Sequence, residues 1–351
     1  MTWTPSYERL IRTLRHQGEA DRVPLVELGI AVKIKSEVLG RSVQSVKDEV
    51  DFALTAGYDY VKLQPVVDMN PAKIFSEGGP KETNLVGADG TRIWADEHQG
   101  VITNEAELER YVFPDVSSID YSRFEEIRRV LPDGMTVIGQ YGDIFTLVWE
   151  LMGFENFSIA LYEDPGLVER LFEKVGNVIY SMFETMVQME VVKVLWYSDD
   201  IAYASGLMLS PPLLRKYFFP WLKRIGELAR KHRKPFMYHS DGVLWPVFDD
   251  IIASGVDAIH PIEPKAMDIV EVKKRYGHAL CVIGNIDLSY TLTRGTVEEV
   301  EAEVKEKLRT VAPGGGYCLG SSNSVPEYVR TENFVAMVTS CKKYGTYPIA
   351  V

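Results

Sequence analysis

The sequence predicts a (β/α)8 TIM barrel, an α/β fold formed by one domain. Eight short apolar runs alternate with longer amphipathic stretches along the 351 residues. Several of these runs are apolar almost throughout, as expected of parallel strands that are covered on both faces. Eight strand–helix units close into a barrel more naturally than they form an open sheet. A doubly wound open sheet is the alternative, but no glycine-rich fingerprint follows the first run.

The apolar runs and the stretches between them define the expected elements. In chain order, strands are expected at residues 23–29, 58–64, 135–142, 191–199, 234–239, 256–262, 279–285 and 315–320. Helices are expected at residues 165–190, 211–233, 243–253, 296–311 and 326–344. The segment 296–311 shows apolar residues at helical spacing, and its first turn is acidic, which complements the helix dipole.

The second unit carries an insertion at 83–104. An Asp-Gly turn lies there between alternating stretches, which indicates a β-hairpin, and we expect it to lie over the mouth of the barrel. No Pro/Gly/Ser-rich linker, internal repeat or low-complexity tract interrupts the chain. Residues 1–351 are therefore interpreted as a single domain.

Bulk composition narrows the class of protein. A net charge of −12 argues against a nucleic-acid partner, because such proteins concentrate Lys and Arg. No window reaches the apolar length of a membrane span, and the first residues lack the features of a secretory signal. Three scattered cysteines fit a reducing compartment. We expect a soluble cytoplasmic enzyme whose apolar tail, 347–351, packs on its own barrel or on a second subunit of a homodimer.

Polar residues gather where the expected strands end. In barrels of this type the loops after the strands surround one rim, which carries the active site. Carboxylates packed together repel and desolvate one another unless protons, metal ions or cations compensate, so an active site is the expected reason for gathering them. The polar residues at the eight ends are Glu27, Gln64, Gln140, Asp143, Asp199, Asp200, His239, Asp241, Glu263, Asn285, Asp287, Ser321, Ser322 and Asn323.

His239 and Asp241 are the most informative of these residues. Alternate residues of a strand face the same side, so both side chains point into one volume, which suits metal ligation or proton transfer. The alternatives are a hydrogen-bonded core histidine and a turn aspartate before Gly242. Only one of Asp199 and Asp200 can easily enter the barrel, and we favour Asp199.

Other candidates also have structural alternatives. Asn285 and Asp287 either line the mouth or form a loop. His260 falls in the middle of an expected strand, where packing is the expected role. No Ser-His-Asp triad can be assembled, and the sequence contains no P-loop or dinucleotide motif.

Several motifs follow one another in a fixed order between residues 135 and 345. They are Ser198-Asp-Asp200, Ser210-Pro-Pro, the segment 217–225, Tyr238-His-Ser-Asp-Gly242, Gly255-Val-Asp-Ala258, Ile283-Gly-Asn-Ile-Asp287, and Gly320 leading to Pro326. In these motifs the chain resembles the uroporphyrinogen decarboxylase superfamily, which includes the corrinoid-dependent methyltransferases. The N-terminal third matches only in layout. The motifs specify the superfamily better than the reaction.

Within that superfamily, the methyltransferase branch fits better than the decarboxylases. Decarboxylases carry an arginine-rich stretch after the first strand that binds propionate groups, whereas here Glu27 would repel such a substrate. Members that methylate a thiol hold zinc with a His-x-Cys pair and a later Cys. This chain has His239-x-Asp241 instead, and Ser321 or Ser322 at the later position. Oxygen and nitrogen ligands would make a bound zinc a stronger Lewis acid, which suits a methyl ether as substrate.

The resemblance implies a methyltransferase that moves a methyl group from a small methylated substrate, such as a methoxylated aromatic, to the cobalamin of a partner corrinoid protein. His239, Asp241 and Glu263 would hold zinc or act as acid catalysts, and Asp199 would be a further ligand or an orienting residue. The expected substrate- or cofactor-binding residues are Glu27, Gln64, Gln140, Trp149, Tyr203, Asn285, Asp287 and Ser321, with Trp94, Tyr141 and Trp196 as further aromatic lining. The alternatives are a cofactor-free lyase or decarboxylase of a small acid, and a barrel that only binds a tetrapyrrole or corrinoid.

Overall fold

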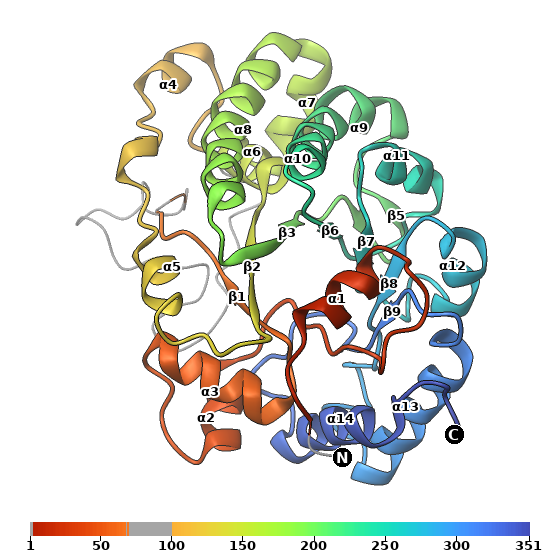
Figure 1. Cartoon of the computed structure of the whole chain (residues 1–351). Helices are drawn as coiled ribbons and strands as arrows, with labels where there is room; N and C mark the ends of the chain where they lie inside the picture. Colours follow the sequence, from red (N-terminus) through yellow and green to blue (C-terminus); the bar gives the residue numbers. More distant parts are fainter. Residues whose placement is uncertain (1–2, 68, 70–99) are drawn as a thin grey trace.

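Seven parallel strands form one curled sheet in the computed structural model, which describes residues 3–67, 69 and 100–351. Their order across the sheet is β1-β2-β3-β6-β7-β8-β9, and Figure 1 shows the helices arranged around the outside. This arrangement confirms the α/β barrel that the sequence predicts. The strands are β1 Tyr60–Leu63, β2 Thr136–Gly142, β3 Val192–Ser198, β6 Phe236–His239, β7 Ala258–His260, β8 Cys281–Ile283 and β9 Tyr317–Cys318, with a separate two-stranded sheet of β4 Ala202–Tyr203 and β5 Gly206–Leu207.

The helices connect successive strands and bury their apolar sides against the sheet. The longest, α8, begins after Asp164, whose side chain accepts a hydrogen bond from the Leu167 backbone, and Pro165 takes the first position, where no backbone N–H is needed. The helices are α1 Tyr7–Leu14, α2 Val32–Leu39, α3 Val46–Ala56, α4 Glu105–Arg110, α5 Ser122–Ile127, α6 Ile144–Met152, α7 Phe154–Glu163, α8 Pro165–Gln188, α9 Pro211–Tyr217, α10 Phe219–Lys231, α11 Phe248–Ala253, α12 Ile269–Tyr276, α13 Val297–Val311 and α14 Thr331–Tyr344, with short 3-10 turns η2 Val116–Ser118 and η3 Trp245–Val247.

Two of the expected helices are divided. The segment 211–233 forms α9 and α10, which meet at Phe218. Pro220, near the start of α10, has no N–H to donate to the preceding turn, so one continuous ladder of helical bonds cannot form there. The segment 243–253 likewise begins with the 3-10 turn η3, which contains Pro246, before α11.

The first expected strand, 23–29, is corrected by the structure. It forms a single parallel bridge between Leu25 and Leu319 instead of a ladder. On its other side, the Tyr60 hydroxyl accepts a hydrogen bond from the Glu27 N–H at 2.8 Å and donates one to the Glu27 carbonyl at 3.0 Å. The eighth wall of the barrel is therefore tied to β9 by backbone and to β1 by one phenol side chain.

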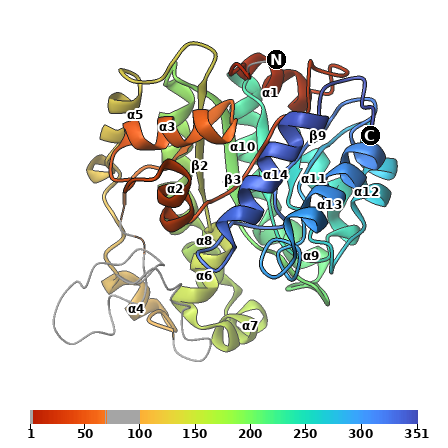
Figure 2. The same ribbon diagram turned by 90° about the horizontal axis from the view of Figure 1, so that it is seen from below.

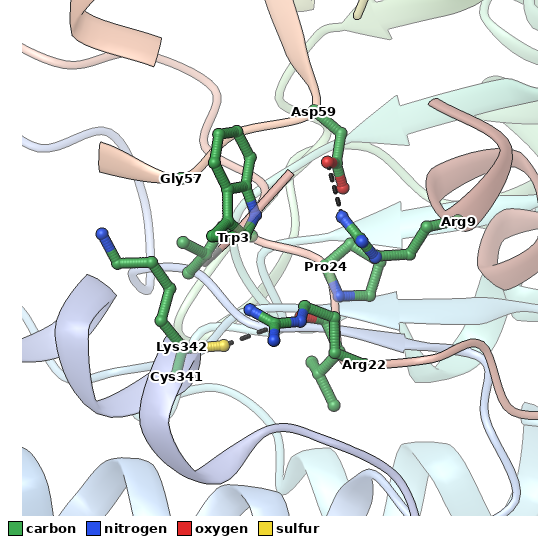
Figure 3. A pocket seen from close by; sticks show the side chains of 10 residues that line it. Trp3, Arg9, Arg22, Pro24, Gly57, Asp59, Cys341 and Lys342 are labelled. Carbon is green, nitrogen blue, oxygen red and sulfur yellow. Dashed lines mark hydrogen bonds and ion pairs between the residues drawn. The ribbon is translucent and has the colours of Figure 1, made fainter. Parts of the chain in front are cut away.

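Helix α1 lies across the end of the barrel where the strands begin (Figure 1). Its Arg9 side chain is buried and donates hydrogen bonds to Asp59 at 2.7 Å and to Asp21 at 2.6 and 2.7 Å; Figure 3 shows the Arg9–Asp59 pair. Burial raises the pKa of Asp59 to about 6, although Arg9 opposes this shift. A cavity of about 10 Å³ beside the pair has room for about one water molecule. Because Asp59 precedes β1, this cavity lies at the opposite end from the strand tips.

Both chain termini lie at the α1 end of the molecule (Figure 2). The apolar tail packs on its own barrel, since Tyr347 donates from its backbone to the Asp21 carbonyl at 3.1 Å and from its hydroxyl to the Ala312 carbonyl at 2.9 Å. The hairpin expected at 83–104 falls outside the described residues, except for 100–104, which form no regular element.

Within the described part of the chain, no single helix has the length and apolarity to cross a membrane. Helices α6 and α7 reach those values only when taken together, as a pair bent by 95°.

Candidate functional site at the strand ends

Asp200, His239 and Asp241 form a compact group where β3 and β6 end. One ligand-type atom from each residue lies within 4.8 Å of the other two. His239 Nε2 is 3.5 Å from Asp200 Oδ1 and 3.9 Å from Asp241 Oδ1. Tetrahedral ligation with bonds of about 2.1 Å places ligand atoms about 3.4 Å apart, so this group needs little rearrangement to hold a cation. The Asp200 side chain is 38% exposed, which leaves one side of the group open to a ligand.

The register of the sheet brings these three residues together. Ser198 at the end of β3 pairs with His239 at the end of β6, and the backbone N–H of the next residue bonds to the His239 carbonyl at 3.0 Å. The segments that follow β3 and β6 then leave the sheet side by side, and the Asp241 N–H donates to Asp200 Oδ1 at 2.8 Å. Gly242 makes the turn that follows, with φ +84°, and a Cβ there would lie 2.6 Å from the backbone of Ala202.

His260, for which we expected packing alone, contacts His239 directly. Their Nδ1 atoms are 2.7 Å apart, so one ring donates and the other accepts. If His239 offers the lone pair of Nε2 to a cation, its proton sits on Nδ1 and is donated to His260, whose own proton is then on Nε2. That Nε2 atom is buried and has no hydrogen-bond partner among the described residues. The Trp196 ring packs edge-on against His260, with ring centroids 5.2 Å apart.

The pKa of His260 lies well below its usual value. Burial is the main cause, and the charges of His239 and Lys62 add to it. The His260 imidazole therefore stays neutral at physiological pH, as a fixed hydrogen-bond partner for His239 should.

Asp199 points away from this group, contrary to our expectation, and Asp200 takes its place. The Asp199 carboxylate is buried and accepts hydrogen bonds from two backbone N–H groups in the first turn of α6 at 2.7 and 3.1 Å. It also accepts from the Thr146 hydroxyl at 2.8 Å and from the Tyr197 hydroxyl at 2.6 Å. Burial raises its pKa to about 7 against the effect of these bonds. Because Ser198 faces the barrel interior, its neighbour faces the helices.

Glu27 and Ser321 form a second contact near the rim. The Glu27 carboxylate accepts hydrogen bonds from the Ser321 N–H at 2.7 Å and from its hydroxyl at 2.6 Å. Burial raises the pKa of Glu27 to about 8, and the bonds from Ser321 oppose the shift. The same hydroxyl lies 2.6 Å from the carbonyl oxygen of Asn323, whose amide group donates to Asp241. The last loop thus links Glu27 to the Asp200–His239–Asp241 group.

Gln64 and Gln140 meet on neighbouring strands inside the barrel. The Gln64 amide donates to Gln140 Oε1, and Gln140 Nε2 donates to the Ser198 hydroxyl at 2.9 Å. Lys62 Nζ donates to the same Gln140 oxygen at 3.3 Å. Lys62 was not among our candidates, although a lysine in the middle of an apolar strand indicates a possible site residue. The interior therefore contains a cation that our sequence analysis missed.

The remaining expected site residues support loops or lie outside the Asp200–His239–Asp241 group. Asn285 Nδ2 donates to the Ile262 carbonyl at 2.7 Å, and its Oδ1 is buried without a partner among the described residues. The Asp287 carboxylate accepts from two backbone N–H groups of its own loop at 3.0 and 2.8 Å, which is the loop-forming alternative. Glu263 is half-buried, and among the described residues it does not belong to the group whose atoms lie close enough together to hold a metal ion.

The residues of the expected aromatic pocket have different surroundings, and Trp196 packs against His260 as described above. Trp149 is buried in α6 against Phe154, with ring centroids 5.6 Å apart, whereas Tyr203 in β4 is 52% exposed. Trp94 lies outside the described residues.

A curled parallel sheet surrounded by helices, with titratable side chains gathered at its strand ends, is the architecture of TIM-barrel enzymes. Comparison with known proteins makes the assignment narrower. The chain belongs to the uroporphyrinogen decarboxylase (URO-D) family, whose model matches residues 98–344, and the predicted superfamily is thereby confirmed.

Curated relatives include the uroporphyrinogen decarboxylases of two bacteria. The protein of Anaeromyxobacter dehalogenans (strain 2CP-C) is 26% identical over 228 residues, which cover 62% of this chain and 62% of the relative. That of Neisseria meningitidis is 22% identical over 298 residues, covering 79% and 80%. The chain thus spans about three fifths of the length of the Anaeromyxobacter relative. The solved structure of a methyltransferase from Methanosarcina mazei has the same fold, with a TM-score of 0.69 and 18% identity over 96% of this chain and 98% of that one.

Proposed function

We propose that this protein is a methyltransferase that moves a methyl group from a small methylated donor to the reduced cobalamin of a separate corrinoid protein. The proposed donor is a methoxylated aromatic compound. The observation that carries the proposal is the group of Asp200, His239 and Asp241 at the open rim of the barrel. The likeness in fold to a methyltransferase over nearly the whole chain supports it. The three cysteines are free thiols, which suits the cytoplasm, where we place the reaction.

The donor set fits a divalent cation, zinc in our proposal. An imidazole nitrogen and two carboxylate oxygens are ligands that zinc accepts, and three protein ligands leave a fourth position for substrate. When bound there, zinc would supply Lewis acidity that stabilises negative charge on the oxygen from which the methyl group departs. In this ligand set Asp200 stands where our sequence analysis placed Glu263.

The residues around the group hold its members in position. His260 fixes the ring of His239 through the 2.7 Å contact between their Nδ1 atoms. Asn323 donates to one carboxylate oxygen of Asp241, and the Asp241 N–H holds Asp200. In the proposed reaction the bond between methyl carbon and oxygen breaks, both electrons stay on the oxygen, which takes up a proton, and the methyl group passes to the partner's reduced cobalt.

Metal analysis and isotope transfer test this function. Purified protein should contain about one zinc per chain, and His239→Ala and Asp200→Ala should lose it. Glu263→Ala is the matched control, because it removes a nearby half-buried carboxylate and should keep the metal. With a donor labelled in its methyl group and a reduced corrinoid protein, label should move to the corrinoid protein in wild type and not in His239→Ala. Metal-free protein that transfers the label at the wild-type rate would refute the role of the site.

A second candidate is a decarboxylase or lyase of a small acid that needs no cofactor. The observation that favours it is the name of the curated relatives, which are uroporphyrinogen decarboxylases. A protonated Glu27, whose pKa is raised to about 8, would supply the proton in such a reaction. Release of carbon dioxide by metal-free protein with substrate alone would select this reading. Binding of reduced cobalamin without transfer from any donor would leave a barrel that only binds.

A further inference from the structure

Lys62 of β1 places an amine inside the barrel. It pairs in register with Ile138 of β2, and residues in register on parallel strands face the same side. Its Nζ donates to Gln140 Oε1 at 3.3 Å. The Gln140 amide is held in turn by the Ser198 hydroxyl, and Ser198 pairs in register with His239. The ammonium group therefore belongs to the same polar layer as the proposed methyl-transfer site.

No carboxylate of the described residues forms a hydrogen bond or ion pair with Lys62, although the charges of Glu49 and Asp143 act on it through space. An ammonium group has three hydrogens to donate, and among the described residues the one acceptor in reach is the neutral Gln140 oxygen. Glu49 acts on Lys62 through space, but its carboxylate binds Lys35 at 2.9 and 2.7 Å. Lys62 is half-buried, so its ammonium group is partly withdrawn from water and yet reachable by a ligand that brings an opposite charge.

His260 supplies a second unpaired group in the same interior. Its Nε2 is buried and has no partner among the described residues, and it carries a proton when His239 donates to Nδ1. Lys62 is near enough for its charge to act on this imidazole. After its bond to Gln140, the Lys62 ammonium group still has hydrogens to donate, and His260 Nε2 has no acceptor among the described residues, so an anionic oxygen group could accept a hydrogen bond from either of them.

We propose that the methyl donor carries a single carboxylate, which binds Lys62 inside the barrel while the methyl group points to the rim. One ammonium group compensates one carboxylate, unlike the arginine-rich stretch that serves a substrate with many. The inference rests on the proposed function for the identity of the methyl group. The binding of the carboxylate is independent of transfer and can be measured alone.

Calorimetric binding of 4-methoxybenzoate and of its neutral amide, 4-methoxybenzamide, tests the proposal. Wild type should bind the carboxylate about tenfold or more tightly than the amide, because an ammonium group forms a stronger hydrogen bond with a charged carboxylate than with a neutral amide. Lys62→Met should abolish this preference, and Lys62→Arg should keep it because the positive charge remains. Lys265→Met is the matched control, since it removes an exposed lysine that follows β7, and the preference should survive.

The pH profile of wild type gives a second measurement. Burial and the charge of Lys35 lower the pKa of Lys62 to about 8, while Glu49 and Asp143 oppose the shift. His260 stays neutral over this range. Affinity for the carboxylate should therefore fall as pH rises above about 8, and affinity for the amide should not change. Glu27 lines the same cavity and its pKa is also raised to about 8, so Glu27→Gln should keep the fall and Lys62→Met should lose it.

The outcomes separate this inference from the proposed function. Equal affinity of wild type for the two ligands, no binding of either, or a preference that survives in Lys62→Met overturns the carboxylate site. A preference that depends on Lys62 without any methyl transfer supports the carboxylate site and removes the methyltransferase. Transfer from 4-methoxybenzoate at equal rates and equal affinities in wild type and Lys62→Met keeps the methyltransferase and overturns the carboxylate site.

Discussion

Replacing Asp199 and Asp200 one at a time should separate a structural aspartate from a ligand. Asp199→Ala removes the acceptor of four hydrogen bonds at 2.6 to 3.1 Å, two of which come from backbone N–H groups that begin α6. Each buried donor left without an acceptor costs about 1–3 kcal/mol, and partial entry of water limits the sum, so we expect a loss of about 3–5 kcal/mol in the free energy of unfolding. Asp200→Ala removes a side chain that is 38% exposed and the acceptor of one part-buried N–H, that of Asp241, and should cost about 1 kcal/mol.

Urea unfolding of chelator-treated protein, followed by fluorescence and circular dichroism, measures both values without a contribution from bound metal. Coincident transitions by the two probes check that the unfolding is cooperative. Metal content is then measured on the untreated proteins. Asp199→Ala should keep zinc as long as it folds, whereas Asp200→Ala should lose it. An Asp199→Ala variant as stable as wild type, or a reversed pattern of metal content, would refute the assignment of the two side chains.

Three further outcomes are expected. Burial raises the folded-state pKa of Glu27 to about 8, above its unfolded value. The contribution of Glu27 to stability is therefore complete at low pH and is lost as pH rises through about 8. In urea titrations, the unfolding free energy of Glu27→Gln relative to wild type should increase from about pH 5 to about pH 9. His260→Phe should weaken zinc binding by about 10–100-fold in chelator competition without abolishing it, because it removes the partner that orients His239; unchanged affinity would argue that the ring contact has no orienting role. Gly142→Ala should destabilise the protein by more than about 3 kcal/mol, since its Cβ would lie 1.6 Å from the Ser198 carbonyl oxygen, and a thermal midpoint within 2 °C or so of wild type would contradict this packing.

Most of the barrel could be predicted because parallel strands buried on both faces leave nearly continuous apolar runs. Seven of the eight expected strands are present, usually shortened at their ends. The exception, 23–29, depends on the Tyr60 hydroxyl, which comes from a residue more than thirty positions away. The local sequence pattern of 23–29 does not show that the Tyr60 side chain takes the place of backbone hydrogen bonds to β1, so this departure was not predictable.

The site was predictable in place but not in detail. Two adjacent aspartates at residues 199 and 200 predict a carboxylate at the end of β3. A register error of one residue exchanges the inner and outer faces, and so decides which of the two is assigned to the site. The contact between His239 and His260 requires the pairing of β6 with β7, which no single segment encodes. Lys62 is the opposite case, because the interruption of an apolar strand by a lysine is visible in the sequence itself.

The Tyr60 side chain connects β1 to the segment at 23–29 where the other neighbouring strands are connected by backbone hydrogen bonds. Tyr60 alone supplies the two hydrogen bonds to Glu27 that stand where a strand ladder would otherwise run. Tyr60→Phe would remove both hydrogen bonds and leave the backbone pairings of the seven strands without a direct change. The spacing between β1 and this segment is therefore set by one side chain and not by a strand ladder.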